Sequence, residues 1–401
     1  MHRGKIYWNI REAYVRSFSF MKMLIDKPRK NTKKRLLFYH LAGLDFGGTE
    51  KYLQILAKHL DKNKYDVYFL HPELHEEGDK RKSRLNYIRD GKVIAIPFAH
   101  ERADDVPPHF VSGMNPEIHE LIKALNIDIL VMAEVGGANY PLTTVRNIPI
   151  IMINIFGVPN VQKNIVYHIC ISEEVSAKLE GVVSKEKRVV FPVPSEPPLP
   201  EMLARGKAIR EKFGIKDSDF VFGRIGRPSD GIFDPIGINA FELIVKNHPE
   251  AHYIIMAPMP ALKSIVSERN IPNVHYIDPS YEEEDIWGFH GSLDALAHFR
   301  FDGESFGLNI AESMIAGNPI LSHKSHIWNA HLEYLDSNFS LVSEKDDFAT
   351  YAKNMESFIA KKKNSDFQNM RRAAEKKGRE LFLIDTTMKR FEELIETAFN
   401  K

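Results

Sequence analysis

Two glutamates, Glu304 and Glu312, stand eight residues apart in the segment 301–321, FDGESFGLNIAESMIAGNPIL. Between them, Gly307 opens a helix that we expect to end at Ala316, because a glycine and then a proline follow that position. The first turn of such a helix presents free N–H groups and the positive end of the helix dipole, which together bind anions. One carboxylate could therefore hold neutral hydroxyls beside a bound phosphate while the other reaches past it.

This arrangement resembles the Glu-x7-Glu motif of retaining GT-B glycosyltransferases, especially those of family 4. The resemblance implies that Glu312 binds the ribose hydroxyls of a nucleotide-sugar and that Glu304 approaches the transferred sugar. It also implies that the diphosphate or the sugar meets the backbone amides of a short stretch, Ser305, Phe306, Gly307 and Leu308. The alternative, from the residues alone, is an amphipathic helix in an α/β protein that carries two solvated glutamates.

A glycine-rich stretch, residues 43–51, follows the first expected strand and leads directly into a helix. It resembles the glycine loop of the same family, in which two glycines precede an acidic residue, here Gly47, Gly48 and Glu50. Glycines at the carboxyl end of a strand let the backbone approach a ligand. The spacing is not that of the dinucleotide-binding fingerprint. A simple turn is the alternative.

The expected strand 220–225 carries Arg224, and Arg227 follows it. In the family that the chain resembles, an arginine at this strand end and a later lysine clamp the diphosphate. We favour Arg227 over Arg224 for the arginine role, and Ile232 stands where the lysine is expected. The missing cation weakens donor binding unless another basic residue, such as Lys324, substitutes. The alternative for a single arginine at a strand end is a surface salt bridge.

The expected strand 148–155 resembles the one that carries a histidine near the transferred sugar in this family. Asn154 stands there instead. Its amide can hydrogen-bond a sugar hydroxyl but cannot shuttle a proton, and an asparagine that only closes a turn is the alternative.

Three of the 17 histidines, His323, His326 and His331, lie in the segment 322–331. Because no carboxylates support them, we favour a substrate-facing loop over a metal site. The pair Asp217 and Asp219 precedes a strand instead of following one, which indicates a turn. No bound metal and no other cofactor is therefore expected.

Short apolar strands alternate with helical patterns from residue 35 onward, as in parallel α/β sheets. We expect strands at 36–42, 66–71, 93–98, 128–133, 148–155, 165–171 and 188–191, and in the second half at 220–225, 252–257, 274–278, 293–299, 319–322 and 339–342. The resemblance implies a GT-B fold, in which two Rossmann-like domains face a central cleft and the last helix crosses back to the first. The expected divisions are a basic extension (1–34), an acceptor domain (35–191), a proline-rich linker (192–200), a nucleotide-sugar domain (201–380) and the crossing helix (381–401).

The chain has no net charge, but residues 1–35 carry eleven Lys or Arg against two acidic residues, a surplus of nine. Residues 6–25 place apolar side chains on one helical face. This segment could lie on an anionic membrane, pack on the protein itself or stay disordered. The single cysteine, Cys170, fits a reducing compartment. We expect a cytoplasmic protein, with peripheral membrane association as one role of residues 1–34, and no nucleic-acid partner.

The resemblance implies metal-independent, retaining transfer of a hexose from a UDP- or GDP-linked donor to a glycan, lipid-linked or other hydroxyl acceptor. Catalysis would then depend on Glu304, Arg227 and Asn154. The alternatives are a catalytically degenerate GT-B protein that binds or assembles with a partner, and a nucleotide-sugar epimerase.

Overall fold

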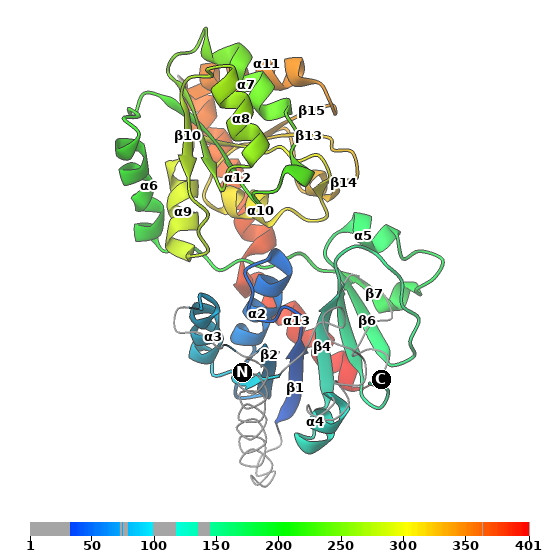
Figure 1. The fold of residues 1–401 in the computed structure, drawn as a ribbon. Coiled ribbons are helices and arrows are strands. Elements are labelled where there is room, and N and C mark those ends of the chain that lie inside the picture. The colour runs from blue at the N-terminus through cyan, green and yellow to red at the C-terminus, as the bar shows by residue number, and fades with distance from the viewer. Residues whose placement is uncertain are drawn as a thin grey trace, which may run out of the picture. The chain divides into compact units, whose positions relative to one another are not determined.

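A computed structural model describes residues 33–72, 74, 79–98, 118–134, 145–362 and 364–400, and Figure 1 shows its elements. The described residues divide into two compact units. The first comprises those up to Ile171, Val175–Phe191 and those from Met388, and the second comprises Ser172–Glu174 and Pro192–Thr387. The predicted basic extension lies outside the described residues except for its last two positions.

The first unit is built on a parallel sheet of seven strands in the order β3-β2-β1-β4-β5-β6-β7. Its strands are β1 (Lys34–Tyr39), β2 (Tyr65–His71), β3 (Ile94–Pro97), β4 (Ile129–Glu134), β5 (Ile150–Asn154), β6 (Ile165–Cys170) and β7 (Arg188–Val190). The helices in this half of the chain are α2 (Gly48–His59), α3 (Arg81–Asp90), α4 (Ile118–Ala124), α5 (Glu173–Ala177) and the short η1 (Lys185–Lys187).

The second unit has a parallel sheet of six strands in the order β10-β9-β8-β11-β13-β15. These strands are β8 (Phe220–Ile225), β9 (Ala251–Met256), β10 (Val274–Ile277), β11 (Ala295–Ala297), β13 (Ile320–His323) and β15 (Ser340–Ser343). A separate pair joins β12 (Gly303–Glu304) to β14 (Trp328–Asn329). The helices are α6 (Pro200–Lys212), α7 (Ile236–Val245), α8 (Pro260–Glu268), α9 (Glu283–Ser292), α10 (Leu308–Ile315), α11 (Phe348–Lys362) and α12 (Ser365–Phe382), with η2 (Asp230–Ile232) and η3 (Ala330–Glu333).

Numbered from its own first strand, each sheet begins with the order 3-2-1-4-5-6, which is the Rossmann order. The direction of winding reverses between β1 and β4 in the first sheet and between β8 and β11 in the second. Open α/β sheets bind ligands at such a reversal, outside the carboxyl ends of the strands. The α/β prediction is therefore confirmed, and every expected strand is present within a few residues of its expected bounds.

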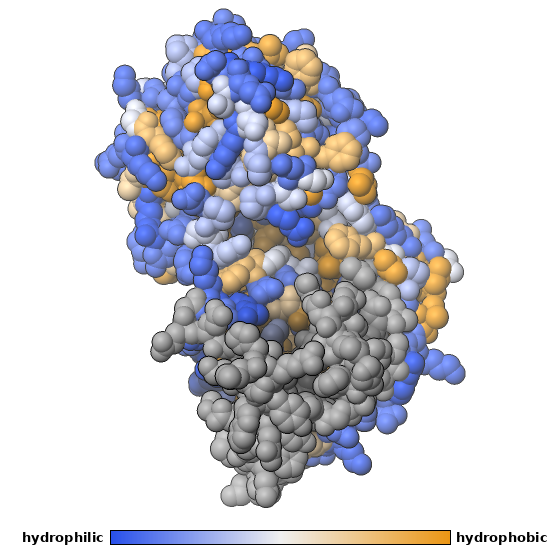
Figure 2. All heavy atoms as spheres, in the orientation of Figure 1, coloured by the Kyte–Doolittle hydropathy of each residue, from blue (hydrophilic) through white to orange (hydrophobic). Residues whose placement is uncertain are grey.

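The core of the second unit is an apolar cluster over β8, β9 and β11, in which Phe222, Phe241, Tyr253 and Phe299 are fully buried. Ile232 belongs to this cluster. The expectation that its position faces the diphosphate is therefore wrong, because a lysine there would place its charge among apolar side chains. On the surface of the second unit, hydrophilic side chains cover most of the face that Figure 2 shows.

The last helix, α13 (Ile384–Phe399), returns the chain to the first unit. Phe391 packs on Phe191 with ring centroids 6.1 Å apart. The Tyr65 hydroxyl donates to the Glu396 carboxylate at 2.6 Å. The crossing helix is therefore present as expected, with an apolar contact inside and a hydrogen bond at its edge.

The proline-rich segment 192–200 belongs to the second unit and forms no helix before Pro200, which is the first residue of α6. Ser195 is its one point of regular pairing, because its N–H donates to Phe382 O at 2.7 Å and its carbonyl accepts from Ile384 N at 3.0 Å. The segment is thus attached to the junction of α12 and α13.

In the described part of the chain, no helix is long and apolar enough to cross a membrane.

Candidate active site

The second unit brings the main candidate residues together at the carboxyl edge of its sheet. Arg224 is the fifth residue of β8, His298 follows β11, and Glu304 ends β12. Helix α10 begins beside them, because the Asn309 side chain in its first turn donates to Ile225 O at the end of β8 at 2.9 Å. The two sequence motifs, from β8 and from residues 301–321, therefore meet at the winding reversal.

The start of α10 is fixed by the backbone of Gly307 and by a tyrosine. Gly307 has φ +90°, a left-handed conformation that favours glycine, and a Cβ there would lie 2.9 Å from the Tyr334 hydroxyl. That hydroxyl donates to Phe306 O at 2.6 Å, and the Tyr334 ring packs on Phe306 and Phe382. The first intrahelical bond is made by Ile310, so the preceding amides lie ahead of the helical ladder.

Glu304 lies between a cation and a buried histidine. Its carboxylate accepts from Arg300 Nη1 at 3.3 Å, and its other oxygen is 3.7 Å from His298 Nε2. Its side chain keeps 14% of its surface exposed. Burial raises the pKa of the Glu304 carboxyl, and the Arg300 charge offsets part of that shift. A carboxyl in this setting can accept a hydrogen bond from a sugar hydroxyl while a neighbouring cation holds its orientation.

Arg224 and Arg227, the two competing arginines, have opposite environments. Arg224 is 1% exposed, and its guanidinium lies 5.4 Å from the Phe299 ring. Among the described residues, neither its Nε nor its Nη1 has a hydrogen-bond partner. Burial lowers the pKa of Arg224 to about 10, and Tyr253 and Glu304 raise it in part. Arg227 is exposed on the loop after β8, so it is the arginine that can reach a ligand directly.

Glu312 lies in the second turn of α10 and is 4% exposed. One of its carboxylate oxygens is 3.9 Å from Nε2 of the fully buried His290. Of the loop residues before it, Phe306 and Gly307 are buried, whereas Ser305 and Leu308 are half-buried. Lys324, the suggested substitute cation, is instead exposed and paired with Glu344 at 2.6 Å.

In the first unit, the glycine loop lies at the carboxyl end of β1, where it was expected. Gly47 is the N-cap of α2, and a Cβ on Gly48 would meet no atom within 4 Å. Gln54 in α2 donates to Gly43 O at 3.0 Å and to Asp45 O at 3.1 Å, which holds the loop against the helix. The backbone at Gly48 is therefore open to close approach by a ligand.

Asn154 has the structural role that the sequence left as its alternative. It is fully buried, its amide nitrogen donates to Val158 O at 2.9 Å, and its oxygen accepts from Gly157 N at 2.7 Å. The side chain closes the turn after β5. Both ends of its amide are used in that turn, and the catalytic role of Asn154 stays a prediction.

Two of the three histidines in the segment 322–331 are interior, so they do not face a substrate as expected. His323 and His331 are fully buried, and only His326 reaches the surface, where it stacks on Phe301. His323 Nε2 accepts from Arg300 N at 3.2 Å, so its proton lies on Nδ1, which donates to Lys324 O. No group of three metal-ligating side chains suited to a metal ion occurs in the described ranges. The pair Asp217 and Asp219 lies in the turn before β8, as expected.

Sequence reasoning missed four residues that shape this site: His298, Arg300, Asn309 and Tyr334. A signal existed for the first two, since His298 lies near the end of the expected strand 293–299 and Arg300 follows it, at the edge where ligands bind. Asn309 and Tyr334 act through contacts with the backbone of other elements, at Ile225 and Phe306. Such contacts leave no motif in a single sequence.

The buried histidines predict acid sensitivity. Burial lowers the pKa of His331 to about 4 and that of His298 well below 6.5, with neighbouring histidines adding to both shifts. Below pH 6.5 the unfolded chain takes up these protons and the folded chain does not, so the free energy of unfolding should fall between pH 6.5 and 4. His331 alone accounts for about 3 kcal/mol over that range. Urea unfolding at a series of pH values should show the fall, and His331→Gln should reduce it. Equal pH slopes for both proteins would contradict the assignment.

No protein-family model matches the chain, and no curated protein sequence matches it. Solved structures do match. A glycosyltransferase from Rickettsia africae superposes with a TM-score of 0.71 at 13% identity, over 92% of this chain and 99% of that one. HepE from Anabaena, solved with UDP and glucose, gives a TM-score of 0.69 at 13% identity, over 91% and 100%. Sucrose-phosphate synthase from Thermosynechococcus elongatus gives 0.66 at 12% identity, over 92% and 99%.

These structures are GT-B glycosyltransferases, and the chain has their fold: two Rossmann-like units and a C-terminal helix that returns to the first. The resemblance to glycosyltransferases inferred from residues 301–321 is therefore confirmed at the level of the fold.

Proposed function

We propose that this protein is a retaining glycosyltransferase that transfers a hexose from UDP-hexose to a hydroxyl of a glycan or of a lipid-linked saccharide, without a metal ion. The observation that carries the proposal is the guanidinium of Arg224. A buried cation with unpartnered nitrogens is costly, and a protein keeps one where its charge acts on a ligand. Its position at the winding reversal, beside Glu304 and the start of α10, supports a ligand with both phosphates and hydroxyls.

The donor would bind with its diphosphate at the amides that precede α10. Arg227 would contact the phosphates directly, and Arg224 would stabilise their charge from beneath. Glu312 would accept hydrogen bonds from the ribose, and Glu304 from the hexose. HepE has been solved with UDP-glucose, which supports a uracil base over guanine.

Catalysis would depend on stabilising the leaving diphosphate. As the bond from the anomeric carbon to the phosphate oxygen breaks, negative charge develops on UDP, where the α10 amides and Arg227 would stabilise it. The acceptor hydroxyl would attack the same face that the phosphate leaves, and its proton would pass to the departing phosphate oxygen. Neither glutamate needs to form a covalent bond in this scheme. Glu304 instead orients the hexose, and Arg300 and His298 hold Glu304 in place.

A donor panel tests the proposal. UDP and UDP-glucose should raise the melting temperature of the full-length protein more than GDP, ADP or their sugars do, because only a bound ligand stabilises the native state. The stabilisation should persist in EDTA, since arginine and amides meet the phosphate charge. Radiolabelled hexose should then pass from the preferred donor to a saccharide acceptor. Selective stabilisation without transfer to any acceptor would favour a degenerate binding protein, and no stabilisation by any nucleotide would contradict the proposal.

A further inference from the structure

A concave site lies in the second unit, at the edge of its sheet opposite the candidate active site. Its lining includes Asp294, which precedes β11, and Asp217, in the turn before β8. Arg224, by contrast, is near the carboxyl end of β8. A strand of this length spans roughly 20 Å, so a ligand here would not touch a donor at the other edge. The cavity has a volume of about 360 Å³, which is within the usual range for small-molecule sites.

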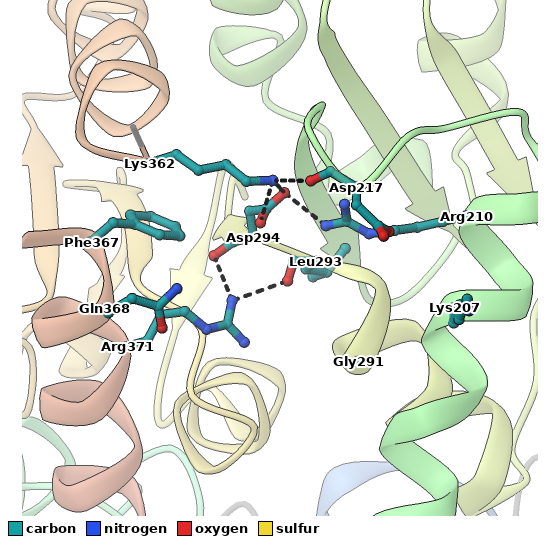
Figure 3. A pocket seen from close by; sticks show the side chains of 10 residues that line it. All are labelled: Lys207, Arg210, Asp217, Gly291, Leu293, Asp294, Lys362, Phe367, Gln368 and Arg371. Carbon is teal, nitrogen blue, oxygen red and sulfur yellow. Dashed lines mark hydrogen bonds and ion pairs between the residues drawn. The ribbon is translucent and has the colours of Figure 1, made fainter. Parts of the chain in front are cut away.

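Three cations lie around Asp294 in this cavity, and two of them contact its carboxylate (Figure 3). Asp294 accepts from Arg210 Nη2 at 2.7 Å and from Lys362 Nζ at 2.9 Å. Arg371 reaches the same turn from α12 and donates from Nη1 to Leu293 O and Asp294 O at 3.3 and 3.4 Å. The Asp294 side chain is only 9% exposed, and Asp217 is the other acidic residue in the lining.

The hydrogen bonds of the cluster leave Arg371 with donors to spare. Arg210 is occupied by Ser292 O and Asp294, and Lys362 by Asp219 O at 2.6 Å and Asp294. Within the described part of the chain, Nε and Nη2 of Arg371 make no hydrogen bond. Figure 3 shows its guanidinium between the α12 side chains and the turn that carries Asp294.

The repulsion among these cations favours the binding of an anion. Burial lowers the pKa of Lys362 and that of Arg371, and in both cases repulsion from Arg210 adds to the shift that Asp294 opposes. A second anion would relieve that repulsion and would pair with the remaining arginine donors. Arginine donors in a fixed fork match the oxygens of a phosphate group.

We propose that this cavity, lined by Arg371, Arg210, Lys362 and Lys207, binds the phosphate group of a small phosphorylated metabolite. The cavity is larger than a phosphate alone, so the rest of the metabolite would extend along Gln368 and Lys207, which are both exposed. This site is separate from the proposed donor site and does not depend on the proposed function.

Calorimetric titration with pyrophosphate tests the proposal on the full-length protein, with UDP present at saturation to fill the donor site. One site should be observed, with binding that weakens as salt is added. Arg371→Gln should weaken it by about tenfold or more, because a charge-assisted contact is lost. The matched control is Arg372→Gln, whose guanidinium pairs with Asn369 on the same helix, and it should bind pyrophosphate as the wild type does.

Gln368→Glu provides a second variant in case Arg371→Gln does not fold. Gln368 is exposed, so the change should be tolerated, and the new carboxylate should repel the anion. Pyrophosphate binding that is unchanged in both Arg371→Gln and Gln368→Glu would overturn the site, as would no binding by the wild type at millimolar concentration. Arg227→Ala should leave this binding intact while weakening UDP, so the two proposals can fail separately.

Discussion

Glu312→Ala should weaken the binding of UDP by about 1.5–3 kcal/mol, because two ribose hydroxyls lose a charged acceptor. That is roughly a ten- to hundredfold rise in Kd, which calorimetry can measure directly. Glu312→Gln keeps the shape of the side chain and one acceptor, so its effect should be intermediate. Glu380→Ala, at an exposed position on α12, is the control and should bind UDP normally.

Glu304→Gln should differ from the Glu312 variants. Its turnover should fall about a hundredfold, and its affinity for UDP should be nearly unchanged. The reason is that Glu304 would contact the hexose, which free UDP lacks. Unfolding of the variant cannot explain a lower turnover at an unchanged UDP affinity. Burial raises the folded-state pKa of the Glu304 carboxyl above its usual value of 4.5. Its ionisation therefore lowers the free energy of unfolding as the pH rises through the folded-state pKa, and Glu304→Gln removes this destabilising effect. If both glutamate variants bind UDP and transfer hexose as the wild type does, the assignment of the motif is wrong.

The sequence predicted the sheets well because their signals are local. Buried parallel strands read as short apolar runs, and glycine and proline mark the ends of helices. The helix expected to end at Ala316 ends at Ile315, with Ala316 as its C-cap and Gly317 at φ +77°. The two-residue strands β12 and β14 were not predicted, because so short a pair depends on contacts between distant segments.

The candidate site was harder to predict because burial decides it. Arg224 and Arg227 look alike in sequence, and only the packing of β8 against Phe299 shows that one is buried and the other exposed. Ile232 was placed by counting from Arg227, whereas the short helix η2 turns it into the core. Asn154 was a sound hydrogen-bonding candidate by type, but the turn after β5 uses both ends of its amide.

Arg224→Met gives the prediction that most directly tests whether the buried charge is functional. Methionine is similar in length and apolar, so it should fill the space beside Phe299 without leaving unpartnered donors. Arg224 has two nitrogens without a hydrogen-bond partner, so removing its buried charge removes a desolvation cost. We therefore expect the free energy of unfolding in urea to stay constant or rise, while hexose transfer falls sharply.

Arg227→Ala should give the complementary result. Its side chain is exposed on a loop, so the free energy of unfolding should change by no more than about 0.5 kcal/mol. UDP should bind more weakly by about 1.5–3 kcal/mol, because a direct charge-assisted contact to phosphate is lost.

The two arginine variants together distinguish a binding site from a structural cluster. If Arg224 only supports the fold, Arg224→Met should lower the free energy of unfolding by several kcal/mol and leave transfer in the surviving protein unchanged. If instead the variant is as stable as the wild type and inactive, the buried charge of Arg224 does not stabilise the fold. The charge then acts on a ligand, and the diphosphate beside Glu304 and α10 is the ligand whose chemistry matches it.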